Sequence, residues 1–180
     1  MLKRWMHNQI AKLERNFGYD AGYFHEVIDV SPAAAFKFSL FQVMAKHRDS
    51  VPKEAWCAAG IAAALTEDCG PCTQLGVDMA LRAGVSARDI SALLRGDIEQ
   101  ASTDAALGFR YGIAVATNSP DALALSEQVE KRYGKRGQIS LAYVVACTRV
   151  YPALKRGLGH GAACSKITVA NDTIPIKQAA

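Results

Sequence analysis

Apolar residues recur along this chain at the three- and four-residue spacing of an amphipathic helix. The first run holds Met6, Ile10, Leu13 and Phe17, and Gly18 follows where such a helix would end. We find no convincing run in which apolar and polar residues alternate, which is the pattern of a half-buried strand. This periodicity predicts an all-α fold.

Caps, prolines and glycines divide the rest of the chain into helical segments. Ser31-Pro32 and the stretch 49–52 each combine a capping residue with a proline suited to a first turn. Such signals predict helices at about 33–47, 52–65, 70–83, 87–94, 101–117, 120–133 and 137–154. We therefore predict a helical domain over residues 31–156, an N-terminal helical extension over 1–30, and a C-terminal tail over 157–180 that forms a loop or an arm.

The charge pattern and the apolar runs exclude some classes of partner. The net charge of +4 comes from lysines and arginines scattered among acids, whereas nucleic-acid binders concentrate them in a stripe. No apolar run approaches the roughly 20 residues of a membrane span. The first residues lack a signal of secretory type, so we expect the five cysteines to lie in the reducing cytoplasm.

The N-terminal segment is basic and amphipathic, with Lys3 and Arg4 beside Trp5 and Met6. Such a helix either lies on a membrane surface or packs on the protein with its apolar face. We favour packing, because one apolar face is what any surface helix presents.

The two cysteines Cys69 and Cys72 flank Gly70-Pro71 at a predicted helix start. Residues three apart on a helix lie about 5–6 Å from each other, and disulfides tolerate Cα separations of about 4.4–6.8 Å. The proline fits here because the first turn has unpaired N–H groups in any case. The pair can therefore open and close with little backbone movement, as a reversible redox couple must.

The helix start also favours the reactive thiolate, by about 0.3–1 kcal/mol. The neighbouring carboxylates of Glu67 and Asp68 oppose this effect, so a further base or hydrogen-bond donor is needed. We expect Cys69, at the helix cap, to receive more of the helix dipole and more solvent. On that ground Cys69 is the predicted attacking thiol for disulfide substrates, while the order for peroxides stays open.

Two other interpretations of the cysteine pair remain. The two thiols can be core residues, or they can form half of a zinc site. His160 and Cys164 have a spacing that suits zinc and would complete a four-ligand set. We favour neither. The two halves of the zinc site lie far apart in sequence, and we predict no bound metal and no cofactor.

The stretch from Val51 to Gly96 resembles the alkylhydroperoxidase (AhpD-like) branch of the carboxymuconolactone decarboxylase superfamily. Val51-Pro52, the Cys-Gly-Pro-Cys motif at 69–72, and the closing motif at 80–90 carry this resemblance. It implies an AhpD-like helical fold assembled as a trimer or hexamer. It also implies reduction of peroxides or disulfides, with electrons from a thioredoxin- or lipoyl-type donor.

Of the residues that do chemistry in this family, only Cys69 and Cys72 are matched. The family uses a glutamate and a histidine as a proton relay, and Cys57 and Gly76 occupy those positions here. Glu67 is our first candidate for a substitute, since burial beside Asp68 would raise its pKa enough to carry a proton. The alternative is that Glu67 is a solvated carboxylate near a helix start.

Other candidates for the relay are weaker. Asp78 is expected to face solvent, and four more residues can reach the site only through tertiary folding: His47, His160, Tyr111 and Tyr143. Cys57 and Cys147 lie among apolar neighbours and are expected to be small core residues. As an alternative, Cys57 would act as a third thiol near the pair.

Two hypotheses about function follow. The first is a thiol–disulfide oxidoreductase in which Cys69 and Cys72 reduce peroxides or disulfides. The second is a non-enzymatic helical oligomer whose cysteines are structural, redox-sensing or metal-binding.

Overall fold

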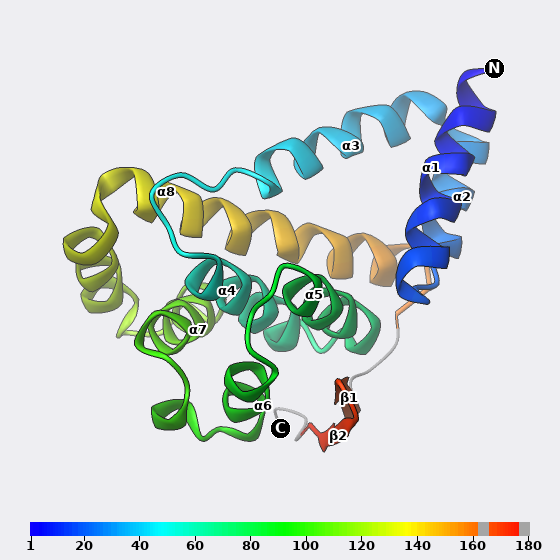
Figure 1. The fold of residues 1–180 in the computed structure, drawn as a ribbon. Coiled ribbons are helices and arrows are strands. Elements are labelled where there is room, and N and C mark those ends of the chain that lie inside the picture. The colour runs from blue at the N-terminus through cyan, green and yellow to red at the C-terminus, as the bar shows by residue number, and fades with distance from the viewer. Residues whose placement is uncertain (162–165, 177–180) are drawn as a thin grey trace.

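The computed structural model describes residues 1–161 and 166–176 and is mostly helical (Figure 1). None of the helices in these ranges has the length and apolarity needed to cross a membrane. In chain order the elements are α1 (Leu2–Phe17), α2 (Gly22–Val30), α3 (Pro32–Ala45), α4 (Lys53–Thr66), α5 (Gly70–Arg82), α6 (Ala87–Arg95), the 3₁₀ turn η1 (Ile98–Gln100), α7 (Thr103–Ala116), α8 (Ala122–Gly157), β1 (Lys166–Val169) and β2 (Asp172–Pro175).

Helix α4 lies at the centre and packs against α5, α7 and α8 (Figure 1). Its side facing α7 carries the fully buried small residues Ala55 and Ala59. Gly108 and Gly112 of α7 face them so closely that a Cβ at Gly112 would lie 2.7 Å from the carbonyl oxygen of Ala59. Small residues on both helices therefore allow this crossing.

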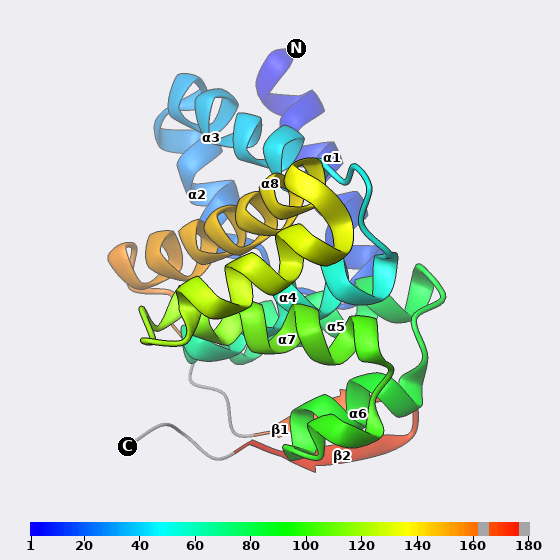
Figure 2. The same ribbon diagram turned by 90° about the vertical axis from the view of Figure 1, so that its left-hand side faces the viewer.

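The N-terminal helices pack on the protein, as we expected. Met6 and Ile10 of α1 are buried in a cluster that also holds Phe24 of α2 and contacts Leu154 of α8. Helix α3 runs across α8 on the opposite side from the β-hairpin (Figures 1 and 2). Met6 and Ile10 of α1 are thus covered within the chain, while Leu2 and Trp5 are exposed.

The predicted helix boundaries are confirmed at the capping residues. Gly18 and Gly96 end α1 and α6 in the left-handed conformation that glycine adopts readily. The Ser31 hydroxyl accepts a hydrogen bond from the Ala34 N–H at the start of α3. Gly134 (φ 72°, ψ 177°) interrupts α8 where we predicted one helix to end before another begins.

The prediction of a loop or arm over 157–180 is wrong for residues 166–175, which form an antiparallel hairpin. Ile167, Val169 and Ile174 are buried against the core, while their neighbours point outward. The segment does alternate apolar and polar residues, as a half-buried strand does. Each strand spans only four residues, so the alternation is too short to predict a strand from the sequence. The fold is therefore mainly, not wholly, α-helical.

Candidate functional site

Cys69 and Cys72 lie at the start of α5, and their sulfurs are at disulfide-bonding distance with Cα atoms 5.3 Å apart. Cys69 is the N-cap, and Pro71 lies within the first turn as predicted. The Thr73 hydroxyl and N–H both donate to the Cys69 carbonyl, which closes that turn. The sequence therefore builds a dithiol pair into a well-formed helix start.

The two sulfurs differ in their exposure. Cys69 is only 4% exposed, because the 67–69 turn and residues Pro152 and Lys155 of α8 surround it. Cys72 is half-buried. The expectation that Cys69 has more solvent is therefore wrong, since the N-cap side chain faces α8 and not the surface.

Each cysteine borders its own cavity. Cys72 lines an apolar cavity of about 330 Å³, which also reaches Cys57 and Gly76, the two positions of the family's relay. The rest of its wall is mainly aromatic and aliphatic, including Tyr19, Tyr23, Phe24, Trp56, Ile61, Leu75, Met79 and Tyr151. Cys69 lines a smaller cavity of about 160 Å³ with Glu67, Asp68, Pro152, Lys155, Arg156 and Gly161. The disulfide thus separates an apolar compartment from a charged one.

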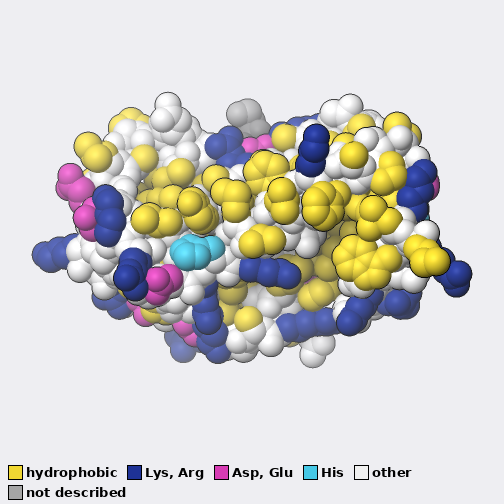
Figure 3. Space-filling view, turned by 90° about the horizontal axis from the view of Figure 1, so that it is seen from above, with side chains coloured by type: hydrophobic (Ala, Val, Ile, Leu, Met, Phe, Trp, Pro, Cys, Tyr) yellow, Lys and Arg dark blue, Asp and Glu magenta, His cyan; other side chains and the backbone are white. Residues whose placement is uncertain are grey.

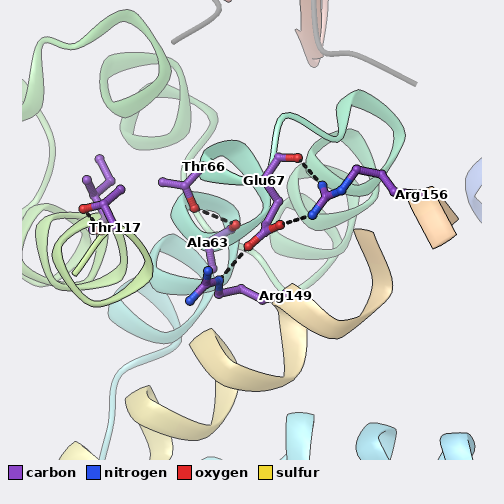
Figure 4. A network of polar contacts seen from close by, with 7 residues as sticks. Ala63, Thr66, Glu67, Thr117, Arg149 and Arg156 are labelled. Atoms are coloured by element: carbon purple, nitrogen blue, oxygen red, sulfur yellow. Dashed lines mark hydrogen bonds and ion pairs between the residues drawn. The ribbon is translucent and has the colours of Figure 1, made fainter. Parts of the chain in front are cut away.

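Two arginines of α8 hold Glu67 (Figure 4). Arg149 Nε donates to one carboxylate oxygen at 2.7 Å and Arg156 Nη2 to the other at 2.5 Å, while Arg156 Nη1 donates to the Glu67 carbonyl at 2.7 Å. Burial alone would raise the pKa of Glu67, but the two guanidinium groups lower it by more, so the net shift is downward. The predicted rise of this pKa is wrong.

The arginines give Glu67 a positioning role. Asp68, the next residue, has a positive φ of 49°, which is an uncommon conformation for a residue with a side chain. The turn leads directly into Cys69. By holding both the carbonyl and the carboxylate of Glu67, the arginines hold the turn that places the first cysteine.

The other relay candidates do not line either cavity. Asp78 accepts a hydrogen bond from Gln74, and Tyr111 is buried in the α4–α7–α8 core. His47 and Tyr143 pack edge to face with ring centroids 5.6 Å apart. His160 Nε2 lies 2.8 Å from a carboxylate oxygen of Glu26.

The other described cysteines have different surroundings. Cys147 is buried in the core, as predicted. Cys57 is half-buried at the wall of the Cys72 cavity, and burial raises its pKa to about 11. At neutral pH Cys57 is therefore a protonated thiol, which is a weak nucleophile.

Five residues at the site were not found by sequence reasoning: Arg149 and Arg156, which hold Glu67, and Tyr19, Tyr23 and Lys155. The Tyr19 hydroxyl lies 4.0 Å from Cys72 Sγ, and the Lys155 ammonium lies over the rings of Tyr19 and Tyr23. Tyr19 and Tyr23 belong to the N-terminal extension, outside the stretch that carries the resemblance. The burial of Lys155 could have been predicted from the sequence, because Cys147, Tyr151 and Lys155 follow one another at four-residue spacing and therefore lie on one face of α8.

The described residues do not form a cluster of side chains that could bind zinc. Within 1–161 and 166–176 no three His, Cys, Asp or Glu side chains lie together in a way that would hold a metal ion. Cys164, the proposed fourth ligand, lies outside the described residues.

In comparisons with known proteins, no family model, no curated protein and no solved structure matches this chain.

Proposed function

We propose that this chain is a thiol–disulfide oxidoreductase of the AhpD-like kind, which reduces peroxides or disulfides through Cys69 and Cys72. The observation that carries the proposal is a bondable cysteine pair at a helix N-terminus with a cavity beside each sulfur. A purely structural disulfide has no need of such access.

Cys72 is the better candidate for the attacking sulfur. It is the more exposed of the two, and it lies in the first turn of α5, where unpaired N–H groups favour a thiolate. The cavity at Cys72 also has room for a substrate, whereas the smaller cavity at Cys69 is lined by charged groups.

The reaction uses both thiols in turn. The Cys72 thiolate attacks one peroxide oxygen, the O–O bond breaks, and the leaving alkoxide takes up a proton. The Cys69 thiol then attacks the sulfenic acid on Cys72, so that the disulfide forms and water leaves. An external dithiol of thioredoxin or lipoyl type returns the two electrons through a mixed disulfide.

The wall of the Cys72 cavity indicates an organic substrate. Its aromatic and aliphatic side chains would bury the apolar part of a hydroperoxide or disulfide and exclude water from it. We therefore propose that organic hydroperoxides are reduced faster than hydrogen peroxide. We propose that the reaction takes place in the cytoplasm, because dithiol donors are kept reduced there.

A redox titration against glutathione buffers, followed by a peroxide-consumption assay, tests the proposal. We expect one reversible two-electron couple that disappears in both Cys69→Ser and Cys72→Ser. Turnover with a dithiol donor should fall to background in the same variants, while Cys147→Ser keeps both properties. A pair that cannot be reduced in the folded protein would contradict the proposal.

A non-catalytic helical oligomer is the second candidate, and the surface of α3 favours it. Phe36, Leu40 and Val43 are each more than half exposed, and Figure 3 shows a band of apolar side chains across this face. Large contiguous apolar patches are uncommon on monomers. Assembly as a trimer or hexamer is compatible with both candidates, so the redox titration distinguishes them.

A further inference from the structure

The site as described lacks the family's proton relay, but a polar group does lie beside Cys72. Tyr19, in the loop between α1 and α2, places its hydroxyl 4.0 Å from Cys72 Sγ. The residue is 7% exposed, and its ring lines the same apolar cavity as the sulfur. A hydroxyl that is held in an apolar wall interacts more strongly with a charge than it would in water.

Two further groups orient Tyr19. Tyr23 acts on Tyr19 as a hydrogen-bond donor would, because it opposes the rise in the Tyr19 pKa while its own pKa is raised. The Lys155 ammonium lies 4.9 Å from the Tyr19 ring centroid and 5.2 Å from that of Tyr23. Lys155 is 4% exposed and also borders the cavity at Cys69, so one buried cation lies close to both halves of the pair.

We propose that the Tyr19 hydroxyl donates a hydrogen bond to the Cys72 thiolate and a proton to the leaving alkoxide, and that Lys155 and Tyr23 are positioning residues that hold it there. This inference rests on the proposed function, and it assigns the missing relay to the N-terminal extension. Within the described residues, neither Glu67 nor any histidine lines the Cys72 cavity.

The proton has a defined path in each direction. When a donor thiolate bonds to the more exposed Cys72 Sγ, the S–S bond breaks and the electron pair leaves on Cys69 Sγ, which takes a proton from water. The second donor thiolate then bonds to the first donor sulfur, and the electron pair of the mixed disulfide leaves on Cys72 Sγ, where the Tyr19 hydroxyl donates to the new charge. When the Cys72 thiolate attacks a peroxide, the departing alkoxide takes the Tyr19 proton. The tyrosinate formed lies next to the Lys155 ammonium and regains a proton from water.

The surroundings of Tyr19 keep its proton in place between turnovers. Burial raises the pKa of Tyr19, so at neutral pH the group is a hydroxyl and therefore a donor. Burial also lowers the pKa of Lys155, an effect that Asp20 opposes. The titratable and charged groups around the cluster are Asp20, Tyr23 of α2, Lys46 at the end of α3, Cys57 on α4, Glu67, Asp68 and Cys69 just before α5, and Cys147, Tyr151, Lys155, Arg156 and His160 on or after α8.

The test measures the rate at which iodoacetamide alkylates Cys72 in the reduced protein as a function of pH, resolved by peptide mass spectrometry. For Tyr19→Phe we expect the midpoint of this profile to rise by about one pH unit, because a hydrogen bond to a charged group is lost. Lys155→Met should move the midpoint in the same direction, and Lys155→Arg should restore most of it. Tyr111→Phe, a buried tyrosine away from both cavities, should leave it unchanged.

The outcomes separate this inference from the function on which it rests. A reversible wild-type couple with an unshifted midpoint in folded Tyr19→Phe would overturn the role of Tyr19 alone. Circular dichroism checks the fold, and Lys155→Met tests the same cluster from α8 if Tyr19→Phe does not fold. An unshifted midpoint in Lys155→Met would then overturn the proposal, whereas a wild-type pair without a reversible couple would remove the proposed function itself.

Discussion

At the scale of single residues, the ion pairs of Glu67 predict a pH-dependent part of the stability. Its side chain is only 12% exposed and receives one donor from Arg149 and one from Arg156. Because its pKa is lower in the folded state, this stabilisation is fully present above the unfolded pKa of about 4.3 and is lost as pH falls through the folded value. We expect Glu67→Gln to cost about 1–2 kcal/mol at pH 7 and much less near pH 2.

Urea unfolding of Glu67→Gln and wild type at the two pH values checks this prediction. Glu99→Gln is the matched control, because Glu99 also pairs with an arginine, Arg110, but is 87% exposed. That variant should change the free energy of unfolding by less than about 0.5 kcal/mol at either pH. Equal costs for the two variants at pH 7 would show that the arginines do not hold the turn before Cys69.

At the scale of elements, the crossing of α4 and α7 depends on glycine. A Cβ at Gly108 would overlap the carbonyl of Ala55, and backbone cannot move aside as a flexible side chain can. We expect Gly108→Ala to destabilise the protein by about 1–3 kcal/mol, as overpacking does. The measurement is the free energy of unfolding in urea.

Gly76→Ala is the control for Gly108→Ala, since both glycines lie inside helices. A Cβ at Gly76 would meet Ile61 at 3.5 Å, which is an ordinary contact. Alanine is the better helix former by about 1 kcal/mol, so Gly76→Ala should be neutral or stabilising. If Gly108→Ala behaves like Gly76→Ala, the helices are not in close contact at this crossing.

The hairpin depends on a side chain of α5. Gln74 donates to the Thr168 carbonyl and accepts from the Thr168 N–H, both at 2.8 Å, and so satisfies the outer edge of β1. Removing it in Gln74→Ala should speed hydrogen exchange at the Thr168 amide by about tenfold, for a loss of roughly 1–2 kcal/mol. Thr173→Ala, on the exposed face of β2, should leave that amide as protected as in wild type.

What could be predicted from the sequence depended on whether the signal was local. Gly18, Ser31-Pro32 and Gly134 act on their own turns, and the structure has helix boundaries at each of them. The contacts of Tyr19 with Cys72 and of Glu67 with Arg156 join residues 53 and 89 positions apart, and no local pattern specifies them. The alternation of apolar and polar residues in the hairpin is also a local pattern, but it is too short to be recognised in a sequence that otherwise has helical periodicity.

At the scale of the whole molecule, the N-terminal extension and the helical domain share one core. Tyr19, Tyr23 and Phe24 belong to the same buried cluster as Ala35 of α3, and Leu75 of α5 packs against it. The wall of the Cys72 cavity is therefore built from both parts of the chain. The stretch 51–96 supplies the sulfurs, and the helices on either side of it supply their surroundings.

The outer face of α3 connects this site to assembly. Gln42 and Ala45 of this helix and its C-cap Lys46 line the Cys72 cavity, while Leu40 and Val43 point outward and are 53% and 71% exposed. A second copy of the chain on this face would cover apolar surface and would also lie next to the Cys72 cavity. Assembly would therefore change both the exposed apolar area and the access to Cys72.

The oligomeric state tests this connection. We expect the wild type to sediment well above the 19.3 kDa of one chain, and Leu40→Lys combined with Val43→Glu to shift it toward the monomer with unchanged circular dichroism. Leu123→Lys, equally exposed at the start of α8 but away from α3, should sediment like wild type. If the wild type is already a monomer at micromolar concentration, the apolar face of α3 does not join copies of this chain, and access to Cys72 is set within one chain.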